Sequence, residues 1–290
     1  MTDIQSIFVS THGAELRSLV ANNREYLWQG DPKFWGRCAP ILFPIVGRLA
    51  NDTLRIDGEE YVMKQHGFAR DAEFVQKQNR FEMVRDDKRD NYPYSFDLSA
   101  NYIVKGDTLS CEWEVKNLGN KDLHFQIGAH PAFNMPDYRV EDEIHGFIQC
   151  YDAENNVVSP VIVNRLDNGL RCSYEAPKSL LNSEAIIAIT DTTFANDAII
   201  IEGKQVQKVT LFDKQGHKVL TVSSPQAESF GLWAPYKPGC PFVCIEPWCG
   251  IADRASFCGD ISERECNHSL ASGATYLFEY SIIINKIATN

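Results

Sequence analysis

The residues best suited to acid–base chemistry in this sequence are His66, His130 and Glu246, which lie far apart along the chain. An imidazole and a carboxylate can pass protons to and from a bound molecule near neutral pH. His130 stands between small residues and a proline in the stretch GAHPAFNMP (128–136), and Glu246 follows the apolar run FVCI. A carboxylate delivered by a buried strand is costly unless it has partners. These residues therefore indicate a site that moves protons.

Each of these residues also has a purely structural interpretation. His66, in the segment KQHGFAR (64–70), could be an ordinary loop histidine, and Glu246 could end its strand by reaching solvent, as most glutamates do. The small residues around His130 could form a packing corner. We expect packing or solvent-facing roles for the remaining histidines, which are His12, His124, His145, His217 and His268.

The segments around these residues also carry side chains that suit a sugar. Aromatic rings can lie against the apolar face of a pyranose, while arginine and asparagine can bind its hydroxyls or a phosphate. Arg48 follows a glycine in an otherwise apolar stretch and is the first arginine of interest. The aromatic candidates are Trp233, Trp248, Phe68 and Phe133.

A metal centre is the rival interpretation of the same residues. Two histidines and one glutamate are a known set of zinc ligands, but the H-E-x-x-H spacing is absent. Cys240, Cys244 and Cys249 lack the short C-x-x-C spacing of structural zinc sites. No G-x-G-x-x-G or P-loop motif is present either, which argues against a nucleotide site. We therefore expect neither a metal centre nor a nucleotide site.

Strands must position these residues, because period-two alternation of apolar side chains dominates the sequence. Three hairpins are predicted, over 52–63, 94–119 and 205–224, with turns at Asp57-Gly58, Gly106-Asp107 and Lys214-Gln215-Gly216. Pro247 is expected to end the strand that carries Glu246. A short helix is predicted over 175–185. Further strands are predicted over 5–10, 122–128, 187–190, 198–201, 242–246 and 275–285.

Residues 1–290 are predicted to form one domain of the all-β class, a large antiparallel β-sandwich with few short helices. The net charge of -11 makes nucleic acid and anionic membranes poor partners. The N-terminus shows no signal-peptide pattern, and no apolar stretch reaches the ~18 residues of a membrane span. We therefore expect a cytoplasmic protein whose nine cysteines are reduced.

Four segments resemble the aldose 1-epimerase (galactose mutarotase-like) family, and most of all its LacX-type branch. Their order and wide spacing match the family as well, so the resemblance covers most of the chain. It implies a β-supersandwich with an open sugar cleft and no cofactor. The matching segments are APILFPIVGRLAN (39–51), HGFARD (66–71), GAHPAFNMP (128–136) and FVCIEPWCGIAD (242–253).

The resemblance also implies a role for individual residues. His130 falls on the general acid that protonates the ring oxygen, and Glu246 falls on the base that takes the proton of the anomeric hydroxyl. His66 falls on a second histidine that binds oxygen near the reacting centre. Arg48 falls on a substrate-binding arginine, and Asp197 on an aspartate that binds hydroxyls. We expect an ionised Glu246, a protonated His130, and small neighbours of His130 that let the sugar come close.

The function that this resemblance implies is a cofactor-free mutarotase, which interconverts the α and β anomers of an aldose or an aldose phosphate. The HGFAR form, with Arg70, also resembles members that act on hexose 6-phosphates, where Arg48 and Arg70 could clamp a phosphate. The alternative is a non-catalytic carbohydrate-binding or regulatory protein on the same scaffold. The expected partner is a small sugar or sugar phosphate, and the expected assembly is a monomer or a homodimer.

Overall fold

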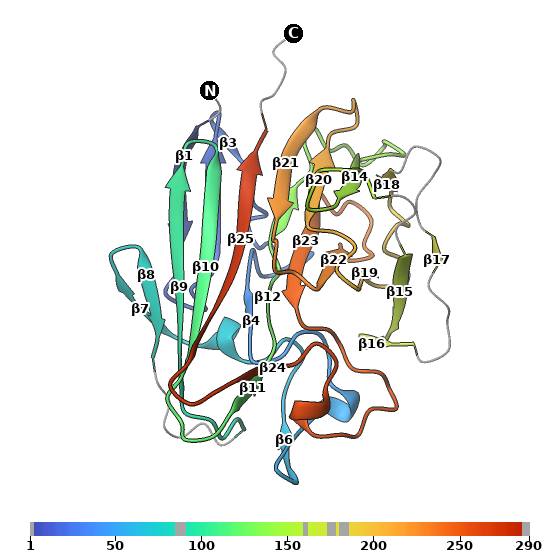
Figure 1. The fold of residues 1–290 in the computed structure, drawn as a ribbon. Coiled ribbons are helices and arrows are strands. Elements are labelled where there is room, and N and C mark those ends of the chain that lie inside the picture. The colour runs from blue at the N-terminus through green and yellow to red at the C-terminus, as the bar shows by residue number, and fades with distance from the viewer. Residues whose placement is uncertain (1–2, 85–90, 159–161, 173–177, 180–185, 286–290) are drawn as a thin grey trace.

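The computed structural model describes residues 3–84, 91–158, 162–172, 178–179 and 186–285. Nearly all regular structure in these ranges is β-strand, and the helical segments among them are three 3₁₀ turns. The turns are η1 (Ala50–Asp52), η2 (Ala69–Asp71) and η3 (Ile261–Glu263). The predicted all-β class is thus confirmed (Figure 1). No helix among the described residues is long and apolar enough to cross a membrane.

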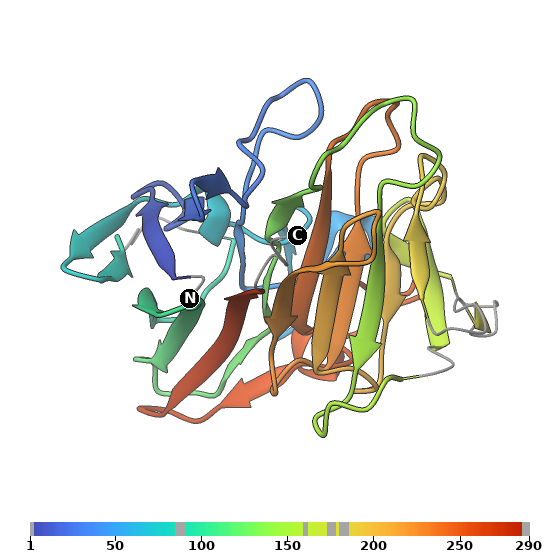
Figure 2. The same cartoon turned by 90° about the horizontal axis from the view of Figure 1, so that it is seen from above.

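Two large antiparallel sheets make up most of the molecule, and Figure 2 shows them from above. Sheet I consists, in spatial order, of β18 (Ile187–Ile189), β14 (Gly146–Tyr151), β20 (Lys208–Phe212), β21 (Lys218–Ser223), β25 (Thr275–Ile284), β10 (Thr108–Asn117), β9 (Phe96–Lys105), β8 (Arg80–Met83) and β7 (Phe74–Lys77). Sheet II consists of β16 (Leu170–Arg171), β15 (Ile162–Asp167), β19 (Ile199–Ile201), β22 (Ser229–Trp233), β23 (Phe242–Cys249), β12 (Ile127–Ala129) and β4 (Ile41–Leu42). Two short strands join sheet II off this path, β13 (Ala132–Asn134) beside β23 and β17 (Lys178–Ser179) beside β15.

Smaller sheets complete the structure around these two. They are formed by β1 (Ile4–Val9), β2 (Leu16–Ala21) and β3 (Arg24–Glu25), by β5 (Thr53–Ile56) and β6 (Glu59–Val62), and by β11 (Leu123–Phe125) and β24 (His268–Leu270). Both large sheets contribute to one continuous apolar core, for example with Trp113 and Phe278 from sheet I and Phe230 and Ile245 from sheet II. Burying this shared apolar surface is what holds the layers together.

The three predicted hairpins are confirmed as β5–β6, β9–β10 and β20–β21. The helix predicted over 175–185 is not found where the structure describes that segment, because Lys178–Ser179 forms strand β17 and pairs with β15. The other residues of that segment lie outside the described ranges.

Pro247 does not end its strand, contrary to the prediction, because β23 continues to Cys249. The backbone N–H of Ile245 donates to the carbonyl of Pro131, so this side of β23 faces the link between β12 and β13. Residue 247 has its nitrogen on the same side, since alternate residues of a strand face the same way. Pairing with β12 begins only at Trp248, so the missing N–H of Pro247 costs no ladder hydrogen bond.

Candidate functional site

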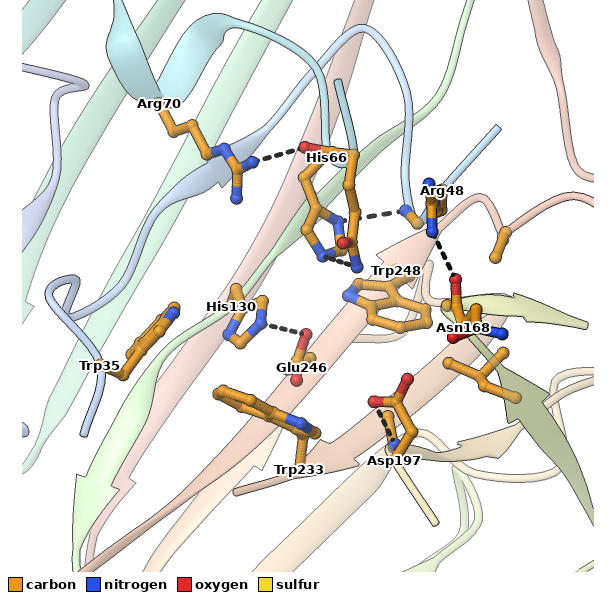
Figure 3. Close-up of a pocket in the computed structure, with 16 residues that line it drawn as sticks. Trp35, Arg48, His66, Arg70, His130, Asn168, Asp197, Trp233, Glu246 and Trp248 are labelled. Carbon is orange, nitrogen blue, oxygen red and sulfur yellow. Dashed lines mark hydrogen bonds and ion pairs between the residues drawn. The ribbon is translucent and has the colours of Figure 1, made fainter. Parts of the chain in front are cut away.

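A cavity of about 470 Å³ opens over sheet II, within the size range of small-molecule sites. Its lining comes from segments between Trp35 and Ala252, so distant parts of the chain converge there (Figure 3). All eight residues predicted for the site line this cavity: Arg48, His66, Arg70, His130, Asp197, Trp233, Glu246 and Trp248.

Strand β23 carries Glu246 and Trp248 on one face, because side chains two residues apart point the same way. The indole of Trp248 lies across the neighbouring strands at Gly231 of β22 and Gly128 of β12. A side chain at either glycine would place its Cβ 2.7 Å from an indole carbon. Trp248 covers Gly128, so packing against the indole is one reason why this residue is small.

Replacing Gly231 by alanine should displace the indole of Trp248, since a Cβ there would lie 2.7 Å from Cζ2. Overpacking of this kind costs about 1–3 kcal/mol, and the shifted indole would no longer cover the bound ligand as before. We expect weaker ligand binding with a smaller change in any rate constant. Titration of the variant with a free aldose, the expected ligand, together with its unfolding curve, checks this. Unchanged ligand affinity in a destabilised variant would contradict it.

His130 and Glu246 meet at the centre of the cavity, with His130 Nε2 3.2 Å from Glu246 Oε2. Both side chains are almost fully buried, with 9% and 2% of their surfaces exposed. Trp35 stacks on the His130 ring with centroids 4.7 Å apart, and Trp233 meets the same ring edge-on at 5.7 Å. Aromatic walls thus fix the imidazole against the carboxylate (Figure 3).

Burial controls the charge of this pair, because transfer out of water disfavours the charged form of either group. Burial, followed by the positive charge of Arg70, lowers the pKa of His130 to about 3. Burial, followed by the negative charge of Asp197, raises the pKa of Glu246 well above its usual range. Burial thus disfavours the ion pair and moves the pKa of each group in the direction that favours its neutral form. This direction runs against the expected resting state of a protonated His130 and an ionised Glu246.

The pH dependence of stability should report the neutral state of His130. Its pKa is about 3 in the folded protein against an ordinary value of 6.5, so the unfolded chain binds more protons here between these values. The stability due to neutral His130 is present above pH 6.5 and is lost as the pH falls toward 3. We expect His130→Gln to lose less unfolding free energy than wild type across this window, as measured by urea denaturation. If the unfolding free energies of the two proteins changed with pH in parallel, the low pKa of His130 in the folded protein would be refuted.

His66 is held in one tautomer by the backbone. The N–H of Gly47 donates to His66 Nδ1 over 3.1 Å, so that nitrogen carries no proton and Nε2 does. Burial, followed by the charge of His130, keeps the pKa of His66 well below its usual value. A neutral His66 in the cavity wall therefore carries its proton on Nε2, which lies 3.4 Å from the side-chain amide nitrogen of Gln65, and is not a cation.

The two arginines of the cavity differ in how they are paired. Arg48 donates to both oxygens of Asp52 over 2.9 Å and to the Asn168 carbonyl over 3.0 Å. Arg70 donates to the Gln65 carbonyl, while its buried Nε has no hydrogen-bond partner. Burial, followed by the charge of Arg37, lowers the pKa of Arg70 to about 10, so it remains a cation at neutral pH.

Some lining residues were missed by the sequence analysis. Trp35 stacks on His130 from a loop that shows no period-two pattern, and Gln65 and Asn168 also line the cavity. An aromatic residue next to a glycine in that loop was the only signal available for Trp35. Two aromatic candidates lie elsewhere, since Phe133 belongs to the apolar core and Phe68 packs against it.

The chain and its fold are similar to known proteins. A family model described as Aldose 1-epimerase matches residues 3–282. The chain is 32% identical over 257 residues to the plasmid-encoded protein LacX of Lactococcus lactis subsp. lactis, which covers 83% of this chain and 84% of that protein. The fold resembles a galactose mutarotase related enzyme from Lactobacillus acidophilus, with 29% identity, 99% and 96% of the two chains covered, and a TM-score of 0.84. It also resembles a galactose mutarotase-like protein from Lactobacillus casei ATCC 334, with 25% identity, 98% coverage of both chains, and a TM-score of 0.86.

Proposed function

The chain belongs to the aldose 1-epimerase family, and on that premise we propose that it interconverts the α and β anomers of an aldose through its own acid and base groups. The observation that carries this proposal is the contact of His130 and Glu246, 3.2 Å apart in a cavity walled by indoles. An aldose in this cavity would meet a proton donor and a proton acceptor at the same carbon.

Anomerisation requires that the cyclic hemiacetal open and close again. One proton must leave the hydroxyl on C1 while another reaches the ring oxygen. In the proposed mechanism Glu246 takes the proton from the hydroxyl and His130 protonates the ring oxygen. The aldehyde then rotates about the C1–C2 bond, and the same two groups work in reverse as the ring closes on the other face.

The charge state of the pair fits this mechanism. A neutral His130 beside a protonated Glu246 holds as many protons as an imidazolium beside a carboxylate. Moving one proton across the 3.2 Å contact therefore produces the reactive form without exchange with solvent. A sugar that hydrogen-bonds to both groups would favour this transfer, since it supplies the partners that burial has removed.

The other cavity residues would bind and orient the sugar. The Nε2–H of His66 would donate to an oxygen near C1, and the carboxylate of Asp197 would accept from a hydroxyl. Trp248 and Trp233 would lie against the apolar parts of the ring. Each of these contacts restricts the sugar to orientations in which the anomeric centre faces His130 and Glu246.

The charges of the cavity favour a neutral aldose as substrate. Asp52 engages the Arg48 guanidinium through both oxygens, which offsets its charge toward a phosphate. Asp197 adds a second carboxylate to the same wall. The positive charge of Arg70, which also lines the cavity, is the feature that favours a phosphorylated sugar, so a 6-phosphate is the second candidate.

Polarimetry or NMR of freshly dissolved α-sugars tests the proposed function. Free glucose and galactose and their 6-phosphates would be followed with and without protein, with a Glu246→Gln variant as the inactive control. We expect faster approach to anomeric equilibrium with a free aldose than with its 6-phosphate. Sugar binding by calorimetry without acceleration of any sugar would instead identify a carbohydrate-binding protein.

A further inference from the structure

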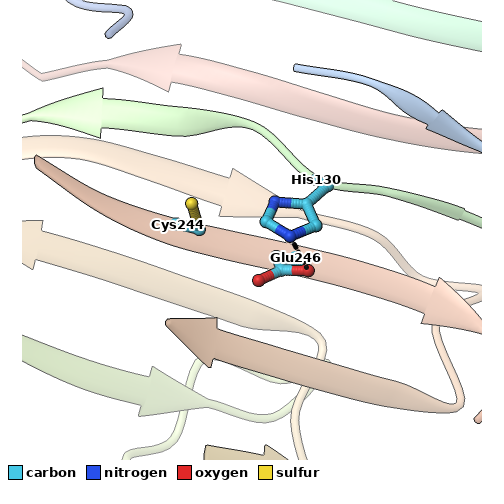
Figure 4. Close-up of side chains that lie close together, drawn as sticks. All are labelled: His130, Cys244 and Glu246. Carbon is cyan, nitrogen blue, oxygen red and sulfur yellow. Dashed lines mark ion pairs between the residues drawn. The ribbon is translucent and has the colours of Figure 1, made fainter. Parts of the chain in front are cut away.

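A third chemically distinctive side chain lies beside the catalytic pair of the proposed mechanism. Cys244 precedes Glu246 by two residues on β23, so both side chains leave the strand on the same face, toward His130 (Figure 4). In the described part of the chain, one group of three or more His, Cys, Asp and Glu side chains has all its ligand atoms within 4.8 Å of one another. That group is His130, Cys244 and Glu246, and all three are buried.

Ring opening, as proposed above, gives this thiol no task. Cys244 is fully buried and does not line the cavity, whereas His130 and Glu246 do. Its sulfur lies within 4.8 Å of ligand atoms of the two residues that line the cavity. A nitrogen, a sulfur and a carboxylate oxygen gathered at one point are the donor types that bind Zn²⁺ in proteins.

The geometry of the pair matches that of two ligands on one ion. Tetrahedral zinc, with bonds of about 2.0–2.2 Å to nitrogen and oxygen, keeps such ligand atoms roughly 3.4 Å apart. The observed separation of His130 Nε2 and Glu246 Oε2 is 3.2 Å. Glu246 Oε2 is buried and accepts no hydrogen bond despite this approach. A carboxyl oxygen without a partner at such depth is costly, and a cation bound to it would remove the cost.

We propose that His130, Cys244 and Glu246 form a three-ligand binding site for Zn²⁺, with the fourth position open to the sugar cavity. Bound Zn²⁺ would occupy the lone pairs of His130 and Glu246 that ring opening needs. The ion would therefore inhibit anomerisation. This inhibitory role, unlike the metal site itself, rests on the proposed function. The ion enters from the cavity side, past His130 and Glu246, and Cys244 completes the site from below.

Binding involves no change of oxidation state. The Cys244 thiol gives up its proton and the sulfur donates a lone pair to the metal, as the thiolate is the ligand form. The proton of the His130–Glu246 pair is also displaced, and both protons pass to solvent. The imidazole nitrogen and the carboxylate then each supply one lone pair.

Absorption spectroscopy with Co²⁺ as the probe tests the site without any reference to activity. We expect the full-length reduced protein to give a thiolate-to-cobalt charge-transfer band that saturates at one ion per chain. Cys244→Ala should abolish this band and weaken binding by about 100-fold or more, since even outer-shell partners can account for that much affinity. Glu246→Gln should weaken it as well.

The matched control is Cys249→Ala, which removes another buried thiol of β23. Cys249 donates to the carbonyl of Gln226 and lies on the opposite face from Cys244. This variant should keep the cobalt band and its affinity. Absence of a saturable band in the wild type, or a band retained in Cys244→Ala, would overturn the proposal. Near-ultraviolet circular dichroism verifies that both variants are folded.

Inhibition by Zn²⁺ is measured separately on sugar anomerisation. Wild type and Cys249→Ala should be inhibited in a way that EDTA reverses, while Cys244→Ala keeps a rate within about twofold of wild type and resists the ion. Equal sensitivity of Cys244→Ala and wild type would overturn the inhibitory role. A protein that binds Co²⁺ through Cys244 but accelerates no sugar would instead count against the proposed function and leave the metal site standing.

Discussion

Glu246→Gln is expected to lower the rate constant for anomerisation by about 10²–10⁴-fold, the usual contribution of one positioned proton-transfer group. Glutamine keeps the shape and hydrogen-bonding oxygen of the side chain but cannot take up or release the proton of the C1 hydroxyl. Because Glu246 is 1% exposed and stands mid-strand, no water can replace its carboxylate without moving the neighbouring residues. Polarimetry with saturating α-sugar gives the rate.

The variant should fold as the wild type does. Burial disfavours the charged form of Glu246 and raises its pKa, so a neutral amide of the same shape suits this buried position in the free protein. We therefore expect equal or higher thermal stability and a sugar affinity close to that of the wild type. Wild-type rates in Glu246→Gln would show that another group acts as the base.

His130→Gln is the second substitution with a large expected effect, again about 10²–10⁴-fold on the rate constant. The glutamine amide can reach toward the place of Nε2, which is 3.2 Å from Glu246, but it carries no transferable proton. Loss of the ring also removes the stacking partner of Trp35. The effect should therefore fall mainly on kcat, with a smaller increase in KM, and steady-state kinetics over a range of sugar concentrations separates the two.

His145 provides a matched control for this substitution. It is 2% exposed, like the buried His130, and its Nε2 lies 2.9 Å from Asp191 Oδ1, but it does not line the cavity. His145→Gln should leave kcat and KM unchanged. If His145→Gln and His130→Gln lowered the rate equally, the loss would reflect a general disturbance of the fold and the proposed acid would be wrong.

The alternation of apolar residues was enough to predict the fold class and its hairpins. In β9 and β10 the alternation shows which side chains face the core. The two strands pair as predicted around the turn at Gly106-Asp107. A strand needs only its own period of two and a turn signal to be recognised, so this information is local. The chemical types of the eight cavity residues, together with the resemblance to a family, likewise sufficed to name them.

Three other features depended on contacts between segments distant in the chain. Pro247 is tolerated inside β23 because the adjoining strands leave a gap on its nitrogen side. Trp35 reaches His130 from a loop with no regular pattern, and Gly128 is small because Trp248 lies over it. No window of sequence contains both partners of such a contact, so alternation along the chain cannot reveal it.

The pKa values of His130 and Glu246 also depend on contacts between segments that are distant in the chain. Sequence alone determined that this protein has an imidazole and a carboxylate suited to proton transfer. Only the tertiary structure decided that both groups are pushed toward their neutral forms, because their pKa values follow from the water that surrounding strands and indoles exclude. Desolvation is a property of the packed environment, and residue identity does not encode it.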